Sequence, residues 1–195
     1  MLSSLVTPPA ALPLSLAEAK LHLRLDTNEE DTLVSGIISA ATGIAEEYLR
    51  RRLISQVWEY RLDEFPSGGF EIPYSPLVSV GSLKYIDADG VLQTFSSSDY
   101  TYEASSGPNP PRARVRLAYG KAWPSARSEE NAVRIAYTCG WADAASVPDA
   151  IKAAIRLIVG SLFANREDVV TGTIATQMPK GSESLLRLYR LFQFV

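Results

Sequence analysis

The chain has 195 residues and a formal net charge of −3, and 46% of its residues are hydrophobic. This composition suits one or two folded cores and argues against both general disorder and tight binding of the free chain to nucleic acid. A single cysteine, Cys139, excludes an intramolecular disulfide, and with the lone histidine, His22, it leaves too few ligands for a transition-metal site. No apolar run reaches the ~20 residues that cross a bilayer, so we expect no membrane insertion. Because metal ligands are too few and phosphate-binding patterns do not occur, we also expect no metal and no cofactor.

The first quarter of the chain is expected to be an arm followed by two helices. Prolines interrupt residues 1–14 and predict an extended N-terminal arm. Two capping-box patterns then predict a short helix ending near residue 25 and a longer helix ending near residue 52. The capping pairs are Ser15 with Glu18 and Thr27 with Glu30.

A change from helical to alternating periodicity predicts strands between residues 53 and 147. Trp58, Tyr60 and Leu62 fall on one face of the first strand. Asp89-Gly90 indicates a hairpin turn rather than a calcium loop, because the later calcium ligands are absent. Further strands are expected at residues 70–72, 78–86, 91–95, 100–103, 113–118 and 132–139.

Helical signals return in the last quarter. Pro148 suits the first turn of a third helix, which is expected to end near residue 165, and Ser182 is expected to cap a last helix. We therefore predict an α+β fold, a small bundle of about four helices with an inserted antiparallel β-subdomain. The expected domains are an arm (1–14), a helical body (15–52 and 148–165), the β insertion (53–147), and a flexible connection with a C-terminal docking helix (166–195).

Few residues favour catalysis. His22 lies in a short helical pattern without a nucleophile motif, and Cys139 reads as a buried structural cysteine. Neither GxxxxGK[ST] nor GxGxxG occurs, which argues against ATPases and dinucleotide enzymes. Arg50–Arg52 are expected to stabilise a helix C-terminus. The alternating Arg112, Arg114 and Arg116 would form a basic strand face that either is simply solvated or contacts DNA or an acidic neighbour.

The C-terminus is unusually apolar for a chain end. Only Arg187, Arg190 and Gln193 are polar after residue 184, so a helix there would be apolar on most sides. Such a helix either docks into a partner or packs on the chain's own bundle. The predicted docking residues are Leu185, Leu186, Leu188, Tyr189 and Phe192.

Several stretches in order along the chain carry a resemblance to one family. They include LSLAEAKLHLRL (14–25), PLVSV (76–80), YID (85–87) with Asp89-Gly90, YTCGW (137–141), residues 147–154, and Asn165-Arg166-Glu167. As a set they resemble siphophage head-tail connector proteins, the adaptor or head-completion family that prophages and gene transfer agents also carry. The resemblance spans nearly the whole chain but stops before Gln193.

The resemblance implies a non-enzymatic virion protein made in the bacterial cytoplasm. Such a protein forms a ring, commonly dodecameric, between the portal protein and the tail-side completion (stopper or terminator) protein. DNA passes through the ring with transient contact, and the C-terminal segment engages the portal.

Two other functions remain open at this point. One is a tail-completion or tail-tube protein, whose ring would be mostly β. The other is a small packaging-associated hydrolase or nuclease, which would need clustered carboxylates to hold a divalent metal.

Overall fold

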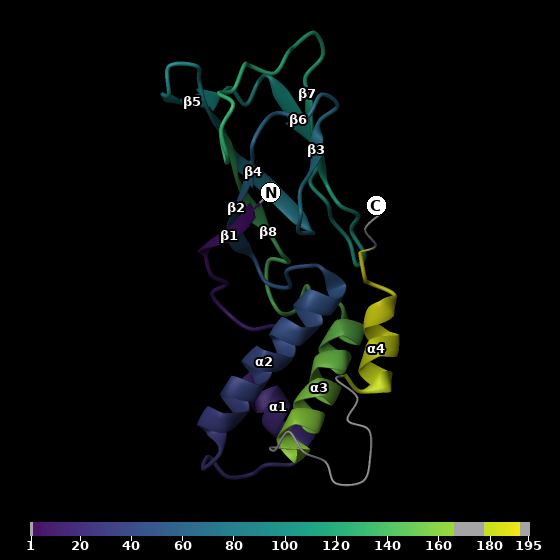
Figure 1. Cartoon of the computed structure of the whole chain (residues 1–195). Helices are drawn as coiled ribbons and strands as arrows, with labels where there is room; N and C mark the ends of the chain where they lie inside the picture. The colour runs from purple at the N-terminus through teal and green to yellow at the C-terminus, as the bar shows by residue number, and fades with distance from the viewer. Residues whose placement is uncertain (1, 166–177, 192–195) are drawn as a thin grey trace. The chain divides into compact units, whose positions relative to one another are not determined.

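A computed structural model describes residues 2–165 and 178–191 (Figure 1). The chain divides into two compact units, and each is interrupted in sequence by the other. The β unit consists of Met1–Ala10 and Ser55–Trp141, and the helical unit of Ala11–Ile54 and Ala142–Val195. Four helices and eight antiparallel strands within the described residues confirm the predicted α+β class.

The helical unit is a small bundle in which α2 and α3 are the longest helices. The helices are α1 (Leu16–Leu23), α2 (Asp31–Leu49), α3 (Asp149–Ala164) and α4 (Lys180–Arg187). α3 contacts each of the other three. None of the described helices is both long and apolar enough to span a membrane.

Apolar stripes at helical spacing explain the packing of α2 on α3. The side chains of Val34, Ile38, Ala41, Ala45 and Leu49 on α2, and of Ile151, Ala154, Ile155, Ile158 and Val159 on α3, are at most 2% exposed. Each of the larger ones stabilises the unit by about 1.5–3 kcal/mol through removal from water. The bundle therefore depends mainly on this seam, since isolated helices of such length are marginal.

The helix starts were predicted with mixed success. The capping box of α1 is confirmed: Glu18 N–H donates to Ser15 Oγ, and Ser15 N–H donates to the Glu18 carboxylate. The second capping box is wrong, because α2 starts only at Asp31 with Glu30 as an N-cap that makes no side-chain cap bond. The last helix starts at Lys180 rather than at Ser182, whose hydroxyl donates to the Pro179 carbonyl.

The β unit contains two sheets. A five-stranded sheet has the order β1-β2-β8-β4-β5, and a three-stranded sheet has the order β3-β7-β6. The strands are β1 (Leu2–Thr7), β2 (Gln56–Leu62), β3 (Phe70–Glu71), β4 (Leu77–Ile86), β5 (Leu92–Phe95), β6 (Tyr100–Tyr102), β7 (Arg114–Leu117) and β8 (Val133–Cys139).

One apolar cluster takes residues from both sheets. Along β8, Val133, Ile135, Tyr137 and Cys139 are buried, whereas the residues between them are partly exposed. This alternation places one face of the central strand in the core, as the period of two predicts. Phe65 stacks on Trp123 with ring centroids 4.8 Å apart and adds an aromatic layer beside the cluster.

The N-terminal arm and the β4–β5 turn complete the larger sheet. The predicted arm contains a strand that sequence analysis did not foresee, since β1 pairs with β2 at the edge of the sheet. The hairpin turn is confirmed: Gly90 has φ 82°, and the Asp87 carboxylate accepts bonds from the N–H groups of Asp89 and Val91. Asp87 is thereby satisfied locally, and the hydrogen bonds from the Gln93 side chain and from these N–H groups lower its pKa.

Candidate interaction surfaces

The segment that contains α4 is tied to the helical unit through buried contacts. Leu186 is fully buried. Arg51, only 1% exposed, donates from Nε to the Tyr189 carbonyl at 2.6 Å, and Leu191 N–H donates to the Leu49 carbonyl at 3.0 Å. Tyr189 and Leu191, which follow α4, are therefore held against the end of α2.

The predicted docking residues have different environments. Leu186 packs inside its own unit, Leu185 and Tyr189 are half-buried, and Leu188 is 72% exposed. Phe192 lies outside the described residues. The expected helix through residue 195 is wrong in its described part, because α4 ends at Arg187. Leu188 is thus the most exposed of the four docking residues that the structure describes, and docking itself stays a prediction.

The three consecutive arginines follow α2, whose last turn contains no basic residue. α2 ends at Leu49, and Arg50 is a C-cap with φ 55°. Arg52 Nη1 lies 3.3 Å from Glu46 Oε2. Burial raises the pKa of Glu46, and this effect exceeds the opposing influence of Arg52 and of the hydrogen bond from Leu53 N–H. Sequence reasoning missed these roles because none of them follows a local pattern.

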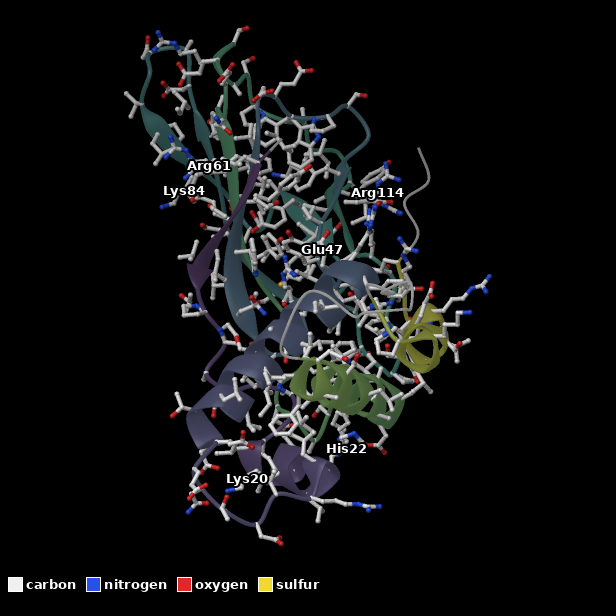
Figure 2. All side chains as sticks on the ribbon, turned by 60° about the horizontal axis from the view of Figure 1, so that its bottom comes forward. Lys20, His22, Glu47, Arg61, Lys84 and Arg114 are labelled. Carbon is white, nitrogen blue, oxygen red and sulfur yellow. The ribbon has the colours of Figure 1, made fainter. Side chains whose placement is uncertain are left out.

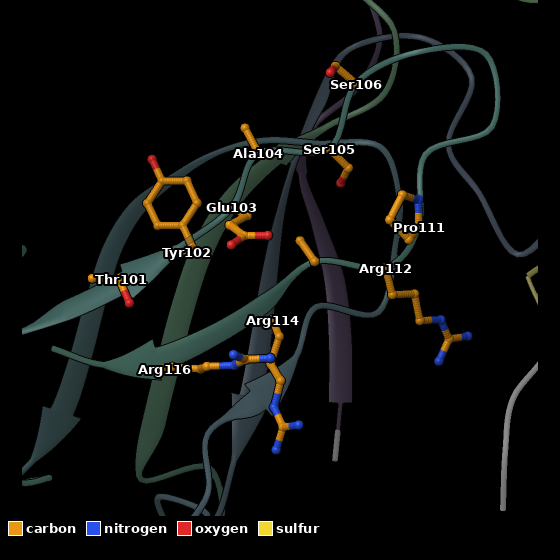
Figure 3. Close-up of a pocket in the computed structure, with 11 residues that line it drawn as sticks. Thr101, Tyr102, Glu103, Ala104, Ser105, Ser106, Pro111, Arg112, Arg114 and Arg116 are labelled. Atoms are coloured by element: carbon orange, nitrogen blue, oxygen red, sulfur yellow. The ribbon is translucent and has the colours of Figure 1, made fainter. Parts of the chain in front are cut away.

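The predicted basic strand face is present at Arg114 and Arg116, whereas Arg112 lies before β7, and the face borders a cavity of about 330 Å³ (Figure 3). Arg114 and Arg116 are exposed on β7, and Val115 between them is buried. Arg114 Nη2 donates to the Gly68 carbonyl at 3.0 Å, and Arg112 Nη1 lies 3.7 Å from a carboxylate oxygen of Glu71. The cavity is lined by residues 101–106, 111–114 and 116.

A second basic group lies on the outer face of the five-stranded sheet. Arg61 is directly opposite Arg134, which is opposite Lys84 on the next strand. Figure 2 labels Arg61 and Lys84, which lie near each other on this sheet. Glu59 pairs with Arg61 at 2.5 Å and compensates part of the charge. Like charges in cross-strand pairs destabilise a sheet, so this row favours an anionic neighbour.

The residues considered for catalysis belong to different units of the chain. His22 is exposed on α1 in the helical unit (Figure 2), whereas Cys139 is fully buried in the β unit, as expected for a structural cysteine. Within residues 2–165 and 178–191, no group of three or more His, Cys, Asp or Glu residues could hold a metal ion.

Comparison with known proteins relates part of the chain to one family. Residues 13–104 match the family model described as phage gp6-like head-tail connector protein. This chain carries a head-tail connector domain. The connector domain begins just before α1 and extends through β6, so it includes parts of both units. The resemblance noted in the sequence is thereby confirmed.

Solved structures share the fold over the full length. A chain in the neck of an empty gene transfer agent particle, computed with C6 symmetry, is 24% identical with a TM-score of 0.81. A chain in the virion of a native gene transfer agent particle has the same identity and score, and one in a native neck computed with C12 symmetry is 23% identical with a TM-score of 0.77. Each match covers 100% of this connector chain and 98% of the other. A search of curated proteins found no match.

Proposed function

We propose that this protein is a non-enzymatic head-tail connector (adaptor) subunit of a phage-like or gene-transfer-agent virion. It assembles into a ring beneath the portal protein, joins the DNA-filled head to the tail-side completion protein, and lets DNA pass. The match to the connector family over residues 13–104 is the observation that carries this proposal. The shared fold with neck chains, two of them computed with C6 or C12 symmetry, supports a ring, and a dodecamer is the expected form.

The charge of the protein suits a conduit. Twelve copies at −3 each would carry −36 in total. A ring of that charge does not hold a polyanion tightly, because affinity for DNA depends mainly on cations that contact phosphate groups. DNA therefore makes only transient contacts as it passes.

The C-terminal segment is proposed to attach the ring to the portal. α4 and residues 188–191 are positioned on the helical unit by Arg51 and Leu186, and Leu188 is exposed. Covering an exposed leucine in an interface contributes about 1.5–3 kcal/mol, or about tenfold to more than a hundredfold in affinity.

Charge substitution at Leu188 tests this attachment. Leu188→Asp is expected to lower recruitment of the connector to portal-bearing heads at least about tenfold, measured by quantitative mass spectrometry of purified particles. Leu21→Asp is the matched control, since Leu21 is an 81% exposed leucine of the same unit. Equal recruitment of both variants would show that Leu188 does not attach the ring.

Deletion of the whole protein tests the connector role separately. Particles assembled without it are expected to accumulate as DNA-filled or emptied heads with unattached tails in electron micrographs. Normal tailed particles in its absence would rule out the connector role. A metal-dependent DNA cleavage assay on the purified protein tests the nuclease alternative.

A further inference from the structure

The arginine-lined cavity and the acidic loops of the β unit have complementary charge. We propose that the cavity of one copy receives the acidic end of the β unit of a second copy. This inference rests on the proposed function, in which copies assemble side by side. It adds the surfaces by which they meet.

The cavity has more positive charge than its own residues neutralise. Arg114 and Arg116 are separated by one residue on a strand, which places their side chains on one face about 7 Å apart. Arg116 makes no ion pair with any described residue. The Arg112 pair with Glu71 is long at 3.7 Å, and the Glu71 side chain is 60% exposed. Nε of Arg112 is buried without a hydrogen-bond partner in the described chain.

The acidic end is formed where β2 and β4 end and β8 begins. Arg127 N–H donates to the Ile86 carbonyl at 2.8 Å, which joins the loop before β8 to the end of β4. Glu64, Asp89 and Glu130 are exposed there, and no hydrogen bond or ion pair is found for their carboxylates among the described residues. These three carboxylates are therefore available to a partner.

The two surfaces lie toward opposite ends of the β unit. The cavity is joined to the start of β4, since Leu77 N–H donates to Ser105 Oγ at 3.0 Å. The acidic loops are joined to the other end of β4, at Ile86. The Ser105 end of the cavity and the acidic loops thus lie at opposite ends of a ten-residue strand, which is roughly 30 Å long. A contact between copies is head-to-tail, and such contacts generate closed rings when the rotation between copies permits.

The cavity suits carboxylates better than a nucleic-acid backbone. Guanidinium groups bind carboxylates with two parallel hydrogen bonds. DNA presents a charge at every nucleotide and favours a continuous basic track. Glu71 and Glu103 interrupt the track here, because one pairs with Arg112 and the other lines the cavity.

Paired charge reversals test the contact on the full-length protein. The cavity variant is Arg114→Glu with Arg116→Glu, and the loop variant is Asp89→Lys with Glu130→Lys. Each is expected to weaken self-association about tenfold or more in sedimentation velocity at about 50 mM salt. The combined variant is expected to restore association to about the wild-type level. The charge-matched control for the cavity variant is Arg24→Glu with Lys180→Glu, at two exposed residues of the helical unit. This control is expected to associate normally.

Several outcomes would overturn the inference while leaving the connector role intact. These are normal association of both reversed variants, no recovery in the combined variant, or no self-association of the wild type at millimolar concentration. The same variants are titrated with a fluorescent 30-bp duplex. Loss of duplex binding by the cavity variant with unchanged self-association would identify the cavity as a nucleic-acid site instead. The connector role depends on tail joining in particles, which is measured separately.

Discussion

Arg51 is predicted to hold the C-terminal segment in place. It is nearly fully buried, and its Nε donates at 2.6 Å to the carbonyl of Tyr189, 138 residues later in the chain. The substitution Arg51→Met keeps a long straight side chain but removes the donor and the charge. The Tyr189 carbonyl would then lose this donor.

The expected cost follows from the type of bond that is lost. A hydrogen bond from a charged donor contributes about 1.5–3 kcal/mol. Relief from burying a guanidinium group offsets part of this loss, so we expect the free energy of unfolding of the helical unit to fall by about 2 kcal/mol. For a chain of this size the midpoint of thermal unfolding would fall by about 4–8 °C.

Two measurements check this prediction. Circular dichroism at 222 nm gives the shift in Tm, and limited trypsin digestion reports cleavage after Lys180 and Arg187, which is expected to become faster. Arg24→Met is the control, since Arg24 is exposed in the same unit. A Tm within about 1 °C of wild type, with unchanged cleavage, would refute the role assigned to Arg51.

Two further substitutions test other parts of the fold. Gly69→Ala is expected to destabilise the β unit by more than about 1 kcal/mol, because Gly69 has φ 83° and a Cβ there would collide with the Val115 carbonyl oxygen. A Cβ at Gly68 has more space, and Gly68 has no positive φ, so Gly68→Ala is expected to change the free energy of unfolding by under about 0.5 kcal/mol. Urea titration of both variants measures the difference. Because burial raises the pKa of Glu46 above its ordinary value of 4.5, protonation favours the folded state. The free energy of unfolding of wild type relative to Glu46→Gln is therefore expected to be highest below about pH 4.5 and to fall as pH rises through the raised pKa. If the free energies of unfolding of the two proteins change with pH in parallel, this prediction is wrong.

The sequence predicted elements whose signals lie within a few residues of each other. The alternation along β8 and the Ser15–Glu18 capping box are of this kind, because burial and capping there repeat at the spacing of the element itself. The Asp89-Gly90 turn is another, since a positive φ requires a residue such as glycine.

Features that depend on distant partners could not be predicted. Leu2–Thr7 forms a strand because β2 pairs with it, and its own pattern resembles an irregular arm. The burial of Arg51 depends on a carbonyl near the other end of the chain. The end of α4 at Arg187 also escaped prediction, because apolar residues continue beyond it while the backbone bonds to Leu49.

The candidate site was predicted only in part. The arginines of β7 were recognised from their spacing. The cavity beside them was not, because the segment containing Ser105 reaches the start of β4 through hydrogen bonds that no local pattern indicates. The acidic end was missed for the same reason, since its carboxylates come from loops far apart in sequence.

The strand order has a consequence for biosynthesis. β8 lies at the centre of the larger sheet, between β2 and β4, yet it is the last of the sheet's strands to be translated. At about 5–20 residues per second, the ribosome needs roughly 4–15 s to proceed from β2 to the end of β8. Until β8 is made, β2 and, once it has been translated, β4 each present an unpaired edge, which is a template for pairing with other nascent chains. A chain prematurely terminated before Val133 would keep both edges open and is expected to aggregate or be degraded.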